Sequence, residues 1–192
     1  MTGPGTARYV IVSAPSGAGK TTIVHHLLQR FPTLEFSVSA TSRPRRANEQ
    51  DGRDYWFLSS PEFLRRRDAG EFVEWEEVYP GSYYGTLRSA LDAIVARGHH
   101  PVFDVDVVGG LRLKKILGDR ALALFIAPPS LEALGERLKA RGTESPASLA
   151  KRLDKAAREM SFAPRFDAII VNDSLPAACQ EAEQRVLALI EP

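Results

Sequence analysis

Cysteine is nearly missing from this sequence, which contains only Cys179. A lone thiol excludes an internal disulfide and a thiolate metal cluster. Long apolar runs are missing too, since no stretch approaches the roughly 18 apolar residues that span a bilayer. The first ten residues lack the apolar core of a signal peptide, and Thr2 stands where myristoylation needs glycine. We therefore expect a cytoplasmic protein with no membrane partner.

A charge excess of either sign is also missing, because 25 basic and 24 acidic residues leave a formal net charge of +1. This balance argues against a protein that coats nucleic acid. Arginine nevertheless supplies 19 of the 25 basic residues. Its planar guanidinium binds two phosphate oxygens at once, whereas lysine offers a point charge. Part of the excess is compositional, but clustered arginines are candidate phosphate ligands.

The length and composition, 192 residues of which 44% are hydrophobic, suit one α/β domain with a full core. Five apolar runs are nearly continuous, as strands buried on both faces are, and stretches of helical periodicity lie between them. This alternation predicts a parallel sheet with helices on both sides. The expected strands are 9–13, 36–40, 102–107, 121–127 and 168–171, and the expected helices are 21–31, 87–97, 131–140, 149–160 and 177–190.

Two polar stretches, residues 42–54 and 141–148, interrupt this pattern. A loop as long as the first is usually functional or disordered in a compact domain. Residues 55–84 differ again, because they hold 9 of the 16 aromatic residues and two β-forming runs, YWFLS and EFVEW. We expect an inserted subdomain with its own small core, and the hydroxyls of Tyr55, Tyr83 and Tyr84 remain available to a ligand.

The sequence APSGAGKT, residues 14–21, follows the first expected strand and opens the first expected helix. It fits a phosphate-binding loop, with alanine where the first glycine is usual. Gly17 and Gly19 permit positive φ, so that successive N–H groups can converge on one oxyanion at the positive end of the helix. Lys20 would reach the β- and γ-phosphates, and the Thr21 hydroxyl would bind Mg²⁺. The predicted nucleoside triphosphate site comprises Ala14, Pro15, Ser16, Gly17, Ala18, Gly19, Lys20, Thr21 and Thr22.

Such a loop alone suits a GTPase, a motor, a transporter ATPase or a small kinase. Later blocks narrow the choice: SVSATSRPRRANEQDGRDYWF, EFVEWEEVYPGSYYGT, FDVDVVGG, FIAPPS, RLKARGTES, KRL and IIVND. In order and spacing they resemble the guanylate kinase family over residues 9–190, nearly the whole chain.

The resemblance implies an α/β fold with a parallel-sheet P-loop kinase core, an inserted small mixed α/β region that binds GMP, and a helical lid. On this chain it implies one domain over residues 1–192. The core would take 8–35, 89–127 and 153–192, the GMP-binding region 36–88 and the lid 128–152.

The resemblance also implies that Glu74, Ser39 and Thr86 bind the guanine base. A carboxylate accepts hydrogen bonds from N1–H and the exocyclic amine of guanine, whereas N1 of adenine carries a lone pair. A site of this kind can reject the wrong base by roughly 10⁴-fold, because buried polar groups are left unpaired.

For the GMP phosphate the resemblance points to Arg43, Arg46, Tyr55 and Tyr84. Arg45 stands where the family often has proline, which leaves open whether Arg45 or Arg46 makes the principal contact. The spacing to the following Glu, Gly and Tyr favours Arg46. The block EEVYPGSYYG is one residue longer than usual, which can reshape a turn without moving Tyr84.

Asp104 and Asp106 fall at the end of an expected buried strand, where ligands of open α/β sheets collect. Asp104 is a second candidate Mg²⁺ ligand or orients the arginines, and Asp106 lies toward GMP, although their division of labour stays open. Gly109 allows close approach of the backbone to GMP.

In the lid and its flank, Arg141 and Arg152 match the cations that stabilise the transferring phosphoryl group, together with Lys20 and Arg46. Arg137 lies four residues before Arg141, so one helix face can present both. The resemblance places Arg137, Asn172 and Asp173 at ATP.

The expected function is phosphorylation of GMP, and of dGMP, by ATP with Mg²⁺, and the sequence leaves monomer or homo-oligomer undetermined. Two alternatives remain. One is a non-catalytic interaction module of guanylate-kinase type, although such modules usually lack an intact phosphate loop. The other is a kinase of another phosphorylated acceptor such as a ribose bisphosphate, which would have no use for Glu74, Ser39 and Thr86.

Overall fold

A five-stranded parallel sheet forms the centre of the molecule in a computed structural model that describes residues 7–140 and 146–191. Its strand order is β2-β7-β1-β8-β9. The strands are β1 (Tyr9–Ser13), β2 (Leu34–Phe36), β7 (His100–Asp104), β8 (Ala121–Ala127) and β9 (Ala168–Val171). The α/β class and the parallel sheet are therefore confirmed.

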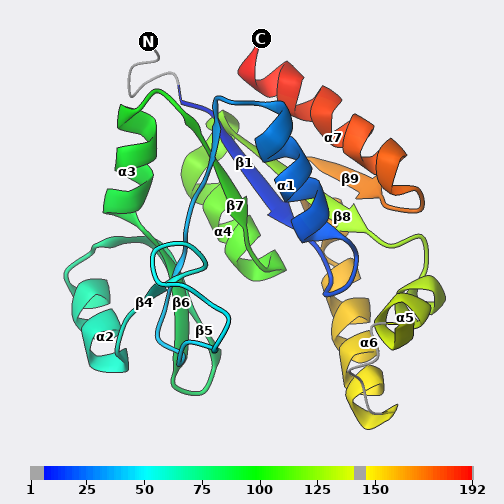
Figure 1. Cartoon of the computed structure of the whole chain (residues 1–192), viewed down its shortest axis with the longest axis horizontal. Coiled ribbons are helices and arrows are strands. Elements are labelled where there is room, and N and C mark those ends of the chain that lie inside the picture. Colours follow the sequence, from blue (N-terminus) through cyan, green and yellow to red (C-terminus); the bar gives the residue numbers. More distant parts are fainter. Residues whose placement is uncertain (1–6, 141–145, 192) are drawn as a thin grey trace.

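Helices cover both faces of this sheet (Figure 1). Val10 and Val12 of β1 face one core, under α1 and α7, whereas Ile11 faces the other, under α3 and α4. This division follows from the two-residue repeat of a strand and explains why the central strands are apolar without alternation. The helices are α1 (Lys20–Arg30), α3 (Arg88–Ala96), α4 (Val107–Leu117) and α7 (Leu175–Ile190), with short 3₁₀ turns at Gly118–Arg120 and Ala163–Arg165.

A second sheet, of order β4-β3-β6-β5, is inserted between β2 and α3. Its strands are both parallel and antiparallel, as expected for a mixed α/β region. Phe63 of its helix α2 stacks on Phe72 with ring centroids 4.4 Å apart, which forms the expected small core. The elements are β3 (Ala40–Thr41), β4 (Trp56–Phe57), α2 (Ser60–Asp68), β5 (Phe72–Tyr79) and β6 (Ser82–Leu87).

Two further helices, α5 (Leu131–Ala140) and α6 (Pro146–Met160), pack through Leu134, Leu138 and Ala156. We call this pair the lid. In Figure 1 the lid lies at lower right and the second sheet at lower left, both beyond the end of the central sheet toward which β1 points. The predicted boundary at residue 152 falls inside α6, which is one continuous helix.

Several boundaries differ from the sequence-based prediction, each for a local reason. The expected strand 36–40 ends at Phe36, and the chain crosses to the second sheet, where the Trp56 N–H donates to the Ser39 carbonyl. The expected strand 102–107 ends at Asp104, because the Asp106 carboxylate caps α4 by accepting from the Gly109 N–H at 2.7 Å. The helix expected at 149–160 begins earlier, at Pro146, as suits a proline in the first turn, so α6 takes the end of the loop expected at 141–148, whose first five residues lie outside the described residues.

No helix among residues 7–140 and 146–191 is long and apolar enough to cross a bilayer.

Candidate active site

The loop between β1 and α1 has the backbone that its glycines predict. Gly17 and Gly19 have φ values of 96° and 98°, a left-handed backbone conformation that residues other than glycine rarely adopt. The loop borders a cavity of about 320 Å³, which we call the P-loop cavity. Most of the predicted phosphate-binding residues line it: Ala14, Pro15, Ser16, Gly17, Gly19, Lys20, Thr21 and Thr22. The start of α1 therefore presents its N–H groups to this cavity.

Ala18, the remaining predicted loop residue, is buried below the loop and does not line the P-loop cavity. Its carbonyl accepts a 2.8 Å hydrogen bond from the side-chain amide of Asn172, which is itself 5% exposed. The Asn172 carbonyl accepts from Arg137 of α5 at 2.8 Å. In this structure Asn172 thus holds the loop from beneath and connects it to the lid, whereas the adjacent Asp173 is exposed.

We expect Asn172→Asp to lower the free energy of unfolding by about 2–3 kcal/mol. The substitution removes the amide donor and places a carboxylate oxygen against the Ala18 carbonyl in a buried position. Chemical denaturation at pH 7 measures the change. Asp173→Asn is the matched control, since it makes the reverse exchange at the exposed neighbour. Equal stability of Asn172→Asp and the wild type would contradict this role.

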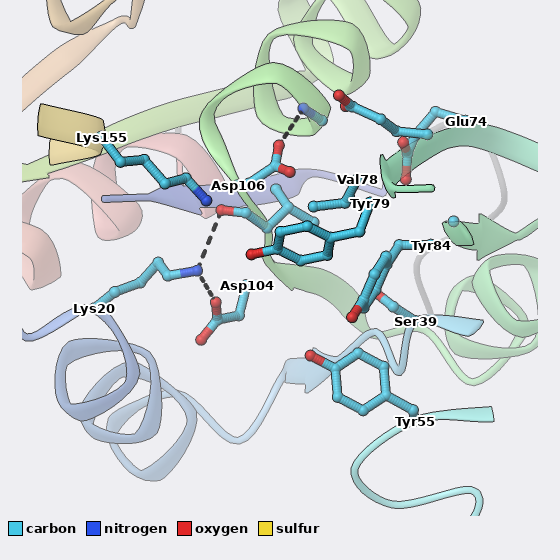
Figure 2. A pocket seen from close by; sticks show the side chains of 14 residues that line it. Lys20, Ser39, Tyr55, Glu74, Val78, Tyr79, Tyr84, Asp104, Asp106 and Lys155 are labelled. Atoms are coloured by element: carbon cyan, nitrogen blue, oxygen red, sulfur yellow. Dashed lines mark hydrogen bonds and ion pairs between the residues drawn. The ribbon is translucent and has the colours of Figure 1, made fainter. Parts of the chain in front are cut away.

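A second cavity, of about 260 Å³, lies between the central sheet, the second sheet and α6. We call it the carboxylate cavity because Glu74, Glu76, Asp104 and Asp106 line it. Figure 2 shows Glu74, Asp104 and Asp106 together with Ser39, Tyr55 and Tyr84 around this cavity. Elements far apart in the sequence therefore converge on one hollow, which is bordered by Lys20 of the P-loop cavity.

Lys20 and Thr21 both contact Asp104 at the end of β7. The Lys20 ammonium pairs with Asp104 Oδ1 and donates to the Val105 carbonyl at 3.2 Å, as Figure 2 shows. The Thr21 hydroxyl donates to Asp104 Oδ2 at 3.4 Å. A hydroxyl and a carboxylate side by side suit a hard cation that prefers oxygen ligands. Among the described residues, no group of three or more His, Cys, Asp or Glu side chains is arranged to hold a metal ion.

Glu74 of β5 is buried at the inner end of the carboxylate cavity, with 9% of its surface exposed. Burial raises the pKa of its carboxyl to about 7, although a 2.9 Å hydrogen bond donated by the Thr86 hydroxyl opposes the increase. Gly109 lies beside this carboxyl, and a Cβ added there would be in ordinary van der Waals contact with Glu74 Oε2 at 3.8 Å. A buried carboxylate with one oxygen oriented by Thr86 is suited to accept hydrogen bonds from a flat polar ligand.

A cluster beside the carboxylate cavity joins Arg43 and Glu49, which do not line the cavity, to Tyr55 and Tyr84, which do. Arg43 donates to both Glu49 oxygens, at 2.7 and 2.6 Å, and its guanidinium lies 4.9 Å from the centre of the Tyr55 ring. The Tyr55 and Tyr84 rings meet edge to face with centroids 6.0 Å apart. The Arg43 hydrogen bonds lower the pKa of Glu49 to about 2. Glu49 therefore orients the arginine, a role that sequence reasoning missed although its spacing from Arg43 was visible.

Other predicted residues lie outside both cavities. Arg46 is exposed, and its backbone N–H donates to Glu49 Oε2 at 2.9 Å, while the Arg45 guanidinium donates to the Glu49 carbonyl at 3.3 Å. Arg152 is exposed on α6. Arg141 lies outside the described residues. Tyr83, which we expected to be available to a ligand, stacks on Phe63 in the small core.

Two lid residues border the cavities without having been predicted. Lys155 lines both cavities, and Glu159, one turn later on α6, lines the P-loop cavity. Their spacing of four residues puts them on one helix face, but only the fold shows that this face turns toward the phosphate-binding loop.

The chain matches the family model described as guanylate kinase over residues 6–188. Curated guanylate kinases are similar to it over most of both chains. This chain is 51% identical to the guanylate kinase of Bacteroides fragilis, over 91% of this chain and 85% of the relative. It is 50% identical to the guanylate kinase of Porphyromonas gingivalis, over 94% of this chain and 96% of the relative. The crystal structure of guanylate kinase from Anaplasma phagocytophilum is similar with a TM-score of 0.76 and 28% identity, and covers 97% of this chain and 88% of that one.

Proposed function

This chain belongs to the guanylate kinase family, and we propose that its two adjoining cavities hold the two substrates of that reaction. The protein is an enzyme, a kinase that phosphorylates GMP with ATP. ATP would occupy the P-loop cavity and GMP the carboxylate cavity. The single observation that carries this assignment is that Lys20 borders both, so a phosphate chain entering from one side meets a phosphate entering from the other.

The reaction joins a GMP phosphate oxygen to the γ-phosphorus of ATP. The bond between that phosphorus and the β,γ-bridging oxygen breaks, and its electron pair stays on the bridging oxygen, which becomes part of ADP. No protein group has to remove a proton, because the attacking phosphate oxygen is already ionised near neutral pH. The protein's task is therefore to position the two phosphates and to neutralise their repulsion.

Guanine would be selected at the inner end of the carboxylate cavity. Glu74 in its ionised form accepts from guanine N1–H and the exocyclic amine, and Thr86 keeps one carboxylate oxygen in place. Ser39 lines the same cavity and offers a hydroxyl to the base, while Asp106 and Gly109 border it. None of these proposed contacts involves the ribose, so dGMP would serve as well as GMP.

The GMP phosphate would be bound by Arg43 with the hydroxyls of Tyr55 and Tyr84. Glu49 already orients the Arg43 guanidinium, so less rotamer freedom is lost when phosphate binds. Arg46 belongs to the same loop and would contact the phosphate from its exposed position. On the ATP side Arg137 and Asp173 flank Asn172, and Arg141 and Arg152 would act on the transferring group.

Thr21 and Asp104 would hold Mg²⁺ beside the phosphates of ATP. Their hydroxyl and carboxylate oxygens lie next to each other, with Thr21 lining the P-loop cavity and Asp104 lining the carboxylate cavity. When bound, the ion neutralises phosphate oxygens and helps to align them. A cytoplasmic location suits an enzyme whose substrates are nucleotides of the cell interior.

Binding of GMP is expected to release protons near pH 7. The pKa of Glu74 is about 7, so about half of the carboxyls are protonated at that pH, whereas guanine requires the ionised form. Affinity for GMP should therefore fall as the pH drops below 7. Titration calorimetry in buffers of different ionisation enthalpy measures the release, expected to be about half a proton. The GMP phosphate, with a pKa near 6, contributes only about a tenth; release limited to that tenth would contradict the assignment.

A coupled ATP assay with four acceptors tests the function as a whole. We expect turnover of GMP and dGMP, with AMP and ribose bisphosphate slower in kcat/KM by roughly 10⁴-fold. Turnover of AMP but not GMP would overturn the base assignment. Turnover of ribose bisphosphate alone would indicate the other kind of kinase, and no turnover with any acceptor would favour a non-catalytic module.

A further inference from the structure

Three residues line both cavities: Lys20, Asp106 and Lys155. In Figure 2 the amino groups of Lys20 and Lys155 approach the junction from two elements, with Asp106 nearby. Lys20 belongs to the phosphate-binding loop, whereas Lys155 is carried by α6 of the lid. The junction between the cavities is therefore bordered by two ammonium groups from separate parts of the molecule.

The backbone of Lys155 is fixed by the packing of its neighbour in the lid, while its side chain is exposed enough to contact a ligand. The next residue, Ala156, is 2% exposed and packs with Leu134 and Leu138 in the lid core. The Lys155 side chain is 53% exposed, and its Nζ lies 3.7 Å from Glu159 Oε1 in an i,i+4 pair. The Glu159 side chain is only 15% exposed, but the pair is long and Lys155 is half exposed, so moving the ammonium onto a stronger anion costs little.

The charges that face Lys155 come from three elements. Glu159 lies on its own helix, Asp106 caps α4, and Glu76 belongs to β5. Burial raises the pKa of both Glu76 and Glu159, and the charge of Lys155 acts against that increase in each case. Lys155 therefore places a positive charge from the lid beside these three acidic side chains. Two bound nucleotides would add further negative charge there.

The phosphoryl group must cross the junction that Lys155 borders. In a loose transition state the negative charge is spread over three equatorial oxygens, and a cation beside them lowers the barrier. We propose that Lys155 is a catalytic residue that contacts the transferring phosphoryl group from the lid, opposite Lys20. This inference depends on the proposed function, because it requires ATP and GMP in the two cavities.

Lys155→Ala tests the proposal. We expect kcat to fall about 10- to 100-fold, with the KM values for ATP and GMP changed less than about threefold, because the contact forms in the transition state. Lys155→Arg should recover part of the loss, since it keeps the charge with a different shape. Lys151→Ala is the matched control, because Lys151 is exposed one turn earlier on α6 and lines neither cavity.

A bisubstrate analogue, adenosine and guanosine joined by five phosphates, separates this role from a structural one. Lys155→Ala should weaken binding of the analogue at least tenfold more than binding of ATP or GMP alone. Wild-type kcat in the variant, or equal losses for the analogue and the single nucleotides, would overturn the proposal. A wild-type enzyme that does not phosphorylate GMP in the same assay would instead overturn the proposed function.

Discussion

Glu74→Gln is expected to lower kcat/KM for GMP by roughly 10³-fold while stabilising the unliganded protein at pH 8. The loss arises because the amide of glutamine presents N–H donors where guanine N1–H and the exocyclic amine also donate. Discrimination between GMP and AMP should fall by a similar factor, since the site no longer carries a charge that guanine alone can satisfy. Steady-state kinetics with both acceptors measures the change.

The variant should be more stable although it is less active, because ionisation of the buried Glu74 carboxyl destabilises the folded wild-type protein. Its folded pKa of about 7 exceeds the usual 4.5, so the folded state binds the proton more tightly than the unfolded state does. Wild-type stability is therefore lost as pH rises from 4.5 to about 7, by on the order of 3 kcal/mol for this buried carboxyl. Glutamine is neutral throughout, so the variant should keep that stability at pH 8.

Denaturation of both proteins at pH 5 and pH 8 measures this difference. We expect similar stability at pH 5 and a more stable variant at pH 8. Glu71→Gln is the matched control, since it removes the same charge just before β5 at a side chain that is 41% exposed. A variant that binds GMP normally, or that is less stable than the wild type at pH 8, would show that Glu74 does not have the role assigned to it.

Lys20→Met is expected to lower kcat/KM for ATP by at least about 10³-fold. The ammonium is fixed by Asp104 and the Val105 carbonyl at the point where both cavities meet, whereas Lys155, which also borders that point, has no such contacts to the phosphate-binding loop among the described residues. Methionine keeps the length of the chain and removes only the charge. Lys20→Arg should also be poor, because a planar fork does not fit a position held for a compact ammonium.

Kinetics at saturating GMP with varied ATP measure the loss, and circular dichroism confirms the fold. Lys115→Met serves as the control, since Lys115 is exposed on α4 and lines neither cavity. Activity of Lys20→Met within tenfold of the wild type would mean that the triphosphate is held elsewhere.

The sequence pattern predicted the first and last residues of an element correctly when the whole segment lies in one kind of environment. β1, β8, β9 and α5 have the predicted bounds, because each is buried or amphipathic along its full length. The prediction was wrong where one apolar run serves two structures, as residues 36–40 do. Helices α2 and α4 were missed, because the first is short and polar and the second begins with two valines, which favour strands.

The phosphate-binding loop could be predicted because its function depends on backbone geometry encoded within a few residues. Glu49, Glu76 and Lys155 could not, since each is an ordinary charged residue until the fold places it beside a cavity. Burial is likewise a property of the fold: the sequence shows a glutamate at position 74, but the displaced pKa of its carboxyl comes from the residues around it.

The two hydrogen bonds of Asn172 couple the phosphate-binding loop to the lid. Its side-chain amide donates to the phosphate-binding loop and its backbone carbonyl accepts from Arg137, so the last turn of α5 and that loop are bonded to the same residue. Any movement of the lid that preserves both hydrogen bonds leaves Arg137 and the phosphate-binding loop in register with each other.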